Sequence, residues 1–268
     1  MKVGAVAQFC YRRALAAKQL TDDALIDRCI ELGCESINLF RLPEEKAARH
    51  RLGEKLRAAG VELVAAIGAI HPNAPRSLVT PDTNASIAGL DRAQEAGARL
   101  CRIIIHPFPR ITRSGMVVQA IDELGRVARA AEERGMVVGL ETHHDGILSI
   151  YENEAIVRNV GSKALGITFD IGNVMTTFED PVLAARVFAP YVVDAHAKDL
   201  HFVDGALTLA PFGEGYVDLP AVLHVLHEAG YRGPLNIEAS PDDGDEDAFL
   251  RQNLAFLREH LAGINKKR

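Results

Sequence analysis

The sequence lacks the features that mark membrane, secreted and nucleic-acid-binding proteins. No apolar run approaches the roughly 20 residues of a membrane-spanning helix. The apolar stretch near Met1 is too short for a signal peptide, so it is interpreted as a strand. Acidic residues outnumber basic ones, which gives the 268 residues a formal net charge of -6. This balance argues against a nucleic acid or an anionic membrane as partner.

Signs of disulfide, redox and dinucleotide chemistry are also missing. The four cysteines show no C-x-x-C spacing, and a chain that is 48% hydrophobic needs no disulfide to form a core. We therefore expect a reducing, cytoplasmic location. No G-x-G-x-x-G motif follows the first expected strand, which weakens a dinucleotide-binding interpretation. No linker or low-complexity tract interrupts the chain, so residues 1–268 are predicted to form a single domain.

What the sequence does contain is a regular alternation of strand and helix signals. Helices repeatedly end at a glycine that precedes a buried strand, as in E-A-G-A-R-L-C and E-R-G-M-V-V-G-L. Thr80 is expected to cap the third helix, with Pro81 in its first turn. The expected strands are 3–7, 36–40, 62–67, 100–105, 137–141, 165–170, 191–196 and 235–238. The expected helices are 21–32, 43–59, 80–97, 117–134, 151–160, 180–188, 219–229 and 247–261.

Eight such units predict an α/β protein built as a single closed (β/α)8 barrel, because parallel strands need crossover helices. An open doubly wound sheet is the alternative. Between the expected strands 191–196 and 235–238, we expect a long loop that precedes the helix at 219–229.

Four successive expected strands end in a side chain that can bind a metal ion. In a barrel, the carboxyl ends of all strands face one mouth, so these side chains should converge. Taken singly, each is more often a helix cap or a surface residue. Three carboxylates in one apolar mouth would repel each other unless a cation held them together. An imidazole with three carboxylates suits Mn, Mg or Co, and Zn or Fe is also compatible. The four residues are Glu141, Asp170, His196 and Glu238.

Short motifs surround these four residues. They are F-D-I-G-N ending at Asn173, H-A-K-D from His196, G-E-G-Y-V-D from Gly213, and the closing I-E at Glu238. Together with the order of the four ligands, they resemble the xylose isomerase-like superfamily. Within it, the sequence is most similar to sugar isomerases and epimerases related to tagatose 3-epimerase, hydroxypyruvate isomerase and inosose dehydratase.

The resemblance implies a metal-dependent enzyme that acts on a small sugar or polyol derivative. The quartet would bind one divalent ion, which acts as a Lewis acid on a developing enediolate. Of Glu141 and Glu238, one would remove the proton beside the carbonyl and the other would return one. Isomerisation or epimerisation is therefore the expected reaction. A homo-oligomer is compatible with the sequence.

Two departures from the tagatose-type epimerases concern substrate contacts. Those enzymes have a histidine three positions after the metal-binding aspartate, where this sequence has Asn173. They also place an arginine after the metal histidine, near the position held here by His201 and Phe202. Asn173 is therefore expected to contact substrate in a different way.

A lyase is the first alternative, because His143 follows the expected ligand Glu141 by two positions. A histidine there recurs in relatives that eliminate water or an aglycone from oxidised sugars, where it resembles a general base. A solvent-facing loop histidine is the other interpretation, and it is the one we expect for His144. We therefore include His143 among the expected catalytic residues.

A DNA-repair enzyme is the second alternative, motivated by two histidines. His71 and His106, each followed by proline, match histidines that bind extra zinc ions in endonuclease IV. That activity would require a basic face and a ligand histidine at Asn173, and the chain has neither. We expect His71 and His106 to contact substrate, and a structural role is the alternative.

Several polar residues near the expected mouth complete the prediction. Lys198 and Asp199 could orient the metal-binding histidine or contact substrate. Glu214, between two glycines, is a further candidate for substrate binding, although G-E-G is also typical of a turn. Arg110 and Arg113 are expected to be exposed loop arginines rather than anion ligands.

Overall fold

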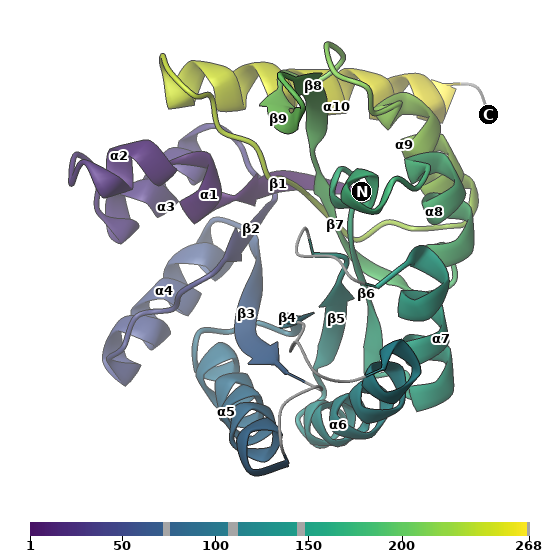
Figure 1. The fold of residues 1–268 in the computed structure, drawn as a ribbon. Helices are drawn as coiled ribbons and strands as arrows, with labels where there is room; N and C mark the ends of the chain where they lie inside the picture. The colour runs from purple at the N-terminus through teal and green to yellow at the C-terminus, as the bar shows by residue number, and fades with distance from the viewer. Residues whose placement is uncertain (72–75, 107–111, 144–147, 267–268) are drawn as a thin grey trace.

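The barrel predicted from the sequence is confirmed. The computed structural model describes residues 1–71, 76–106, 112–143 and 148–266. Eight parallel strands close in the order β1-β10-β7-β6-β5-β4-β3-β2, with helices around them (Figure 1). The barrel strands are β1 Lys2–Val6, β2 Ser36–Leu39, β3 Glu62–Ile70, β4 Leu100–Ile105, β5 Val137–Glu141, β6 Leu165–Asp170, β7 Val192–Ala197 and β10 Pro234–Ile237.

The outer helices begin at caps that the sequence supplies. Thr21 accepts a hydrogen bond from Ala24 N, and Asp180 accepts two from the first turn of its helix. Among the described residues, the outer helices are α3 Asp22–Glu31, α4 Lys46–Ala58, α5 Arg76–Glu95, α6 Arg113–Glu133, α7 Ile150–Val160, α8 Pro181–Phe188, α9 Leu219–Glu228 and α10 Glu246–Lys266. None of the helices in the described ranges is long and apolar enough to cross a membrane.

The predicted start of the third outer helix was wrong. Helix α5 begins at Arg76, ahead of Thr80, so Thr80 is not its cap. Pro81 therefore lies beyond the first turn, where a proline removes one helix hydrogen bond. The sequence signal failed because Thr-Pro is typical of a helix start but does not exclude a turn before it.

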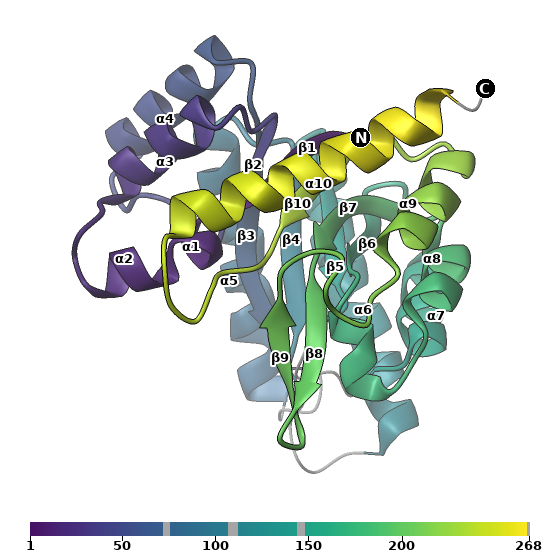
Figure 2. The ribbon, with the colours of Figure 1, turned by 90° about the horizontal axis from the view of Figure 1, so that it is seen from above.

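Short elements near the barrel mouth were not predicted. Two short helices, α1 Ala7–Cys10 and α2 Arg12–Ala16, follow β1, and a 3-10 helix, η1 Asn173–Thr177, follows β6. The long loop after β7 contains an antiparallel hairpin of β8 Asp199–Val203 and β9 Ala206–Ala210, which projects away from α10 (Figure 2). Asp204 and Gly205 form its turn with φ of 50° and 83°. Asp-Gly between alternating apolar residues is a strong hairpin signal that could have predicted it.

A chain of buried polar groups crosses the barrel interior beneath the mouth. Ser36 Oγ donates to Asn236 Oδ1 at 2.7 Å, and Asn236 Nδ2 donates to Asp194 Oδ1 at 3.2 Å. Asn38 Nδ2 donates to the other oxygen of Asp194 at 3.3 Å. Strands β2 and β10 are the two neighbours of β1. The three hydrogen bonds link both of them to β7 through buried side chains. The network holds a carboxylate in the middle of the barrel.

Candidate metal centre and active site

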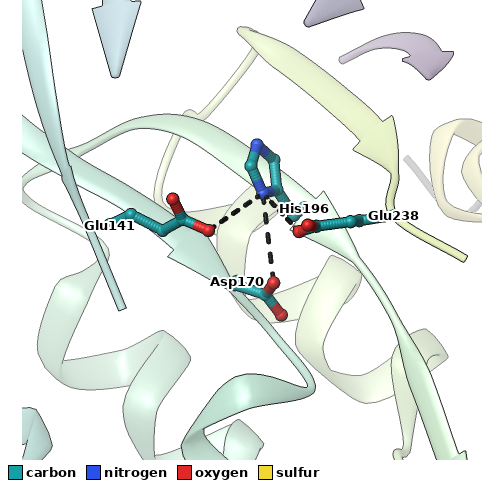
Figure 3. Close-up of side chains that lie close together, drawn as sticks. All are labelled: Glu141, Asp170, His196 and Glu238. Carbon is teal, nitrogen blue, oxygen red and sulfur yellow. Dashed lines mark hydrogen bonds and ion pairs between the residues drawn. The ribbon is translucent and has the colours of Figure 1, made fainter. Parts of the chain in front are cut away.

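Four side chains from four different strands meet at the barrel mouth. Glu141 and Asp170 are the last residues of β5 and β6, His196 lies near the end of β7, and Glu238 follows β10 directly. Their ligand atoms all lie within 4.8 Å of one another, and all four residues are buried (Figure 3). Parallel strands in register place equivalent ends at one level, which is why residues distant in sequence converge here.

The donor set fits a divalent metal ion. His196 Nδ1 lies 2.9 Å from Glu238 Oε2, 3.7 Å from Glu141 Oε1 and 4.0 Å from Asp170 Oδ2 (Figure 3). One imidazole nitrogen and three carboxylate oxygens therefore face one small volume. Such oxygen-rich sets suit Mn²⁺, Mg²⁺ or Co²⁺, and Zn²⁺ also accepts them.

The imidazole is held from its far side by a residue that the sequence analysis missed. His196 Nε2 lies 3.3 Å from Asp194 Oδ2 and 3.0 Å from Asn38 Nδ2. A carboxylate at Nε2 leaves Nδ1 turned toward the ligand cluster. The signal was present in the sequence, because Asp194 precedes His196 by two positions and so points to the same side of the strand.

Asp199 does not orient His196, which corrects one of the predicted roles. Its carboxylate accepts hydrogen bonds from the backbone N–H groups of Gly213, Gly215, Val217 and Leu200, at 2.9 to 3.1 Å. A Cβ at Gly215 would collide with this carboxylate. The G-E-G turn is thus organised by Asp199, and the glycine at 215 is needed for the close approach.

Two buried cations pair with the ligand carboxylates. Lys198 Nζ donates to Asp170 Oδ2 at 2.7 Å and to Asn173 Oδ1 at 2.9 Å. Arg102 on β4 forms an ion pair with Glu141. The sequence analysis missed Arg102, although a single arginine in the apolar strand L-C-R-I-I-I is an unusual charge that requires a partner.

Burial and these ion pairs shift the proton affinities of the site. Burial raises the pKa of Asp170 to about 8, although the charge of Lys198 opposes this. Burial disfavours the imidazolium of His196, but hydrogen bonds to Asp194 and Glu238 outweigh it and raise the pKa to about 10. Burial also opposes ionisation of Glu238, yet the charge of Lys198 and the bond to His196 hold its pKa well below its usual range.

A cavity of about 540 Å³ opens beside the cluster. Glu238, Lys198, Asn173 and His143 line its inner side. Apolar side chains from the β8–β9 hairpin, from α1 and from the end of β2 also line it, among them Leu207, Leu209, Phe9 and Phe40. The cations Arg12 and Arg102 belong to the same lining. A cavity that combines apolar walls with several polar and charged side chains is typical of a small-molecule site.

A family model described as the xylose isomerase-like TIM barrel matches residues 26–260 of this sequence. The chain belongs to this family. Among its relatives, an uncharacterised protein of Methanocaldococcus jannaschii is 29% identical over 177 residues, which cover 62% of this chain and 58% of that protein. An inosose dehydratase of Clostridium beijerinckii is 23% identical over 146 residues, which cover 48% of each. The matches therefore span about half the length of these relatives.

The fold of the family is also seen in solved structures. The crystal structure of a D-tagatose 3-epimerase-like protein superposes with a TM-score of 0.81 and 20% identity, covering 100% of this chain and 99% of that one. At this identity the likeness establishes the fold. It agrees with the closed order of the barrel strands.

Three histidines from successive strand ends form a row at the mouth of this xylose isomerase-like barrel. His71 stacks on His106 with ring centroids 5.3 Å apart, and His106 meets His143 edge-on at 5.4 Å. His71 Nδ1 lies 2.8 Å from Asp82 Oδ2. Within the described part of the chain, His143 lines the 540 Å³ cavity while the other two do not. Substrate contact by His71 and His106 stays a prediction.

Two further predicted residues, Glu214 and Arg113, do not line the cavity. Glu214 is exposed, and its backbone carbonyl accepts a hydrogen bond from His201 Nε2, so the structure does not place its carboxylate on the cavity. Arg113 forms a surface ion pair with Glu152 at 2.6 Å, as expected of an exposed arginine. His144 and Arg110 lie outside the described residues.

Proposed function

We propose that this chain is a divalent-metal-dependent isomerase or epimerase that acts on a small ketose or polyol derivative. The observation that carries the proposal is the convergence of Glu141, Asp170, His196 and Glu238 beside a cavity that Glu238 lines. A volume of about 540 Å³ is ordinary for a small-ligand pocket. Membership of the xylose isomerase-like family supports the same reaction class.

The four residues would hold the ion, and their neighbours would keep them in place. A bound divalent ion supplies positive charge for the oxygens of a hydroxyketone and for the negative charge that develops on them. Lys198 fixes the Asp170 carboxylate, and Asp194 fixes the tautomer of His196. The apolar hairpin side chains Leu207 and Leu209 line one wall of the cavity.

Proton transfer is assigned to the two glutamates. Of the two, Glu238 lines the cavity, so one of its carboxylate oxygens takes the proton from the carbon beside the carbonyl. Return of that proton by Glu238 to the neighbouring carbon, with transfer of the hydroxyl proton to the former carbonyl oxygen, completes an isomerisation. Epimerisation needs a proton delivered from the opposite face. That role falls to Glu141 in its protonated form, and Glu238 then keeps the proton that it removed.

A lyase is the second candidate, and the position of His143 favours it. His143 lines the same cavity as Glu238, where its imidazole could take a proton during β-elimination. One relative is an inosose dehydratase, which gives this reaction class independent support.

Incubation with a panel of ketoses and keto-sugars in deuterated water separates the two reactions. Isomerisation is supported if the product has the molecular formula of the substrate and carries deuterium on the carbon beside the carbonyl. A conjugated enone that absorbs in the ultraviolet supports elimination. Neither label nor enone from any substrate, with each candidate metal present, would contradict both proposals.

A further inference from the structure

Cationic side chains outnumber carboxylates in the lining of the cavity beside the cluster. Among the described residues that line it, three are cationic, Arg12, Arg102 and Lys198, while Glu238 carries the one carboxylate. Aromatic rings support all three cations. Arg102 lies 4.8 Å from the centroid of Phe40, and Arg12 and Lys198 lie 5.0 Å and 5.7 Å from that of Phe9.

Two of these cations are already committed to the metal site. Arg102 pairs with Glu141, and Lys198 bridges Asp170 and Glu238 at 2.7 Å and 3.5 Å. Both cations are buried, so their charges are matched by those carboxylates rather than by water.

Arg12 differs, because its charge is not matched by a buried group. In the described part of the chain its carboxylate partner is Asp242, at 3.5 Å, and the side chain of Asp242 is 81% exposed. Such a loose, solvated contact contributes little and leaves the guanidinium able to bind a ligand. Arg12 itself is 40% exposed on its side chain and stacks on Phe9, which orients its planar donors.

The ion pairs of the cavity cations point the same way. Arg102 and Lys198 each pair with a buried carboxylate of the metal site, whereas the carboxylate that pairs with Arg12 is exposed to solvent. An anionic occupant of the cavity could therefore compete with Asp242 for Arg12.

We propose that Arg12 receives a terminal anionic group, a carboxylate or a phosphate, on the sugar derivative that this site binds. The inference rests on the proposed function for the nature of the substrate, and it narrows the substrate class to acidic or phosphorylated hydroxyketones. Guanidinium groups match both anions through paired N–H donors. Arg12 is thus a specificity-determining residue, and it takes no part in proton transfer.

Binding of three matched probes tests the proposal. D-fructose, D-fructuronate and D-fructose 6-phosphate differ at C6, so titration calorimetry with the manganese-loaded protein compares a neutral end with two anionic ends. We expect at least one anionic probe to bind about 10-fold or more tightly than fructose. The tighter of the two identifies which anion the site prefers.

Variants at two neighbouring arginines locate the effect. Arg12→Gln should weaken binding of the preferred anion by about 10- to 100-fold and leave fructose unchanged. Arg13→Gln is the matched control, because Arg13 Nη1 donates to the Gly244 carbonyl and does not line the cavity. Unchanged metal content and melting temperature in both variants would confirm an intact fold. Arg12→Lys should retain part of the preference for the anionic probe over fructose.

Equal affinity of the wild type for fructose and both anions would overturn the inference, as would full anion affinity in Arg12→Gln. Failure of the proposed function looks different. In that case none of the probes would exchange a carbon-bound proton in deuterated water, while the Arg12-dependent preference for anions would remain.

Discussion

Asp194 Oδ2 lies 3.3 Å from His196 Nε2, on the side of the imidazole ring opposite to Glu238. Both residues are fully buried. The aspartate therefore decides which ring nitrogen carries the proton and leaves Nδ1 free to act as a metal ligand.

Replacing this aspartate should weaken metal binding although it is not itself a ligand. Asp194→Asn should lower the affinity for Mn²⁺ by about 10- to 100-fold, because the amide no longer fixes the tautomer. Competition with a fluorescent chelator measures the change. Asp199→Asn is the control, since its carboxylate binds loop N–H groups rather than His196. Equal loss in both variants would contradict the assigned role.

Loss of the cavity carboxylate should abolish proton transfer. Glu238→Gln keeps the size of the side chain but removes its basic oxygen, so turnover should fall by at least about 10²-fold. The rate of deuterium incorporation into a ketose substrate measures this step, and the metal content measures loss of the ligand. The exposed Glu259→Gln should behave as the wild type. Substantial turnover by a metal-free Glu238→Gln sample would exclude the mechanism.

Metal affinity should rise with pH. In the metal-free protein the pKa values are about 8 for Asp170 and about 10 for His196, and both groups must lose a proton to become ligands. Below pH 8, binding should therefore release about two protons, falling to about one above it. Calorimetry in buffers with different ionisation enthalpies counts these protons. A release of zero at pH 7 would show that the site is already deprotonated.

The buried pair of Arg102 and Glu141 should matter most when metal is removed. Arg102→Gln removes the ion-pair partner of the buried Glu141, so the free energy of unfolding should fall by about 3–5 kcal/mol in EDTA. With Mn²⁺ present the loss should shrink, because the ion offsets the same charge. Urea unfolding measures both.

A matched control for that pair comes from the protein surface. Arg113→Gln breaks an ion pair to Glu152 in which the arginine side chain is 58% exposed, so its cost should stay within about 1 kcal/mol. Similar costs for the two variants would mean that burial does not govern the energy of the Arg102 pair.

Much of the architecture was predictable because its signals are local. Glycine after most of the helices and an apolar run after the glycine mark the βα units. The eight expected strands match the eight barrel strands to within a few residues. The start of α5 was not predictable from Thr80, since the residues before Thr80 are themselves helical. A capping signal at one residue competes with the helix propensity of the residues that precede it. The β8–β9 hairpin was missed although Asp204 and Gly205 carried its signal.

The roles of individual charged residues were harder to predict from the sequence. Arg102 and Asp194 sit in strands whose neighbours are apolar, and their partners Glu141 and His196 are only known once strands are paired. Arg12 reaches the cavity because two short helices after β1 carry it there. Neither spacing nor composition specifies such contacts.

By itself, then, the amino-acid sequence determined the barrel, the order of its strands and the four residues at their ends, because periodicity and residue type act over short stretches of chain. The tertiary structure alone decided which cation neutralises which carboxylate, which aspartate holds His196 and which arginine faces the cavity. Those pairings depend on distances of a few ångströms between side chains far apart in the chain, and only the closed barrel sets these distances.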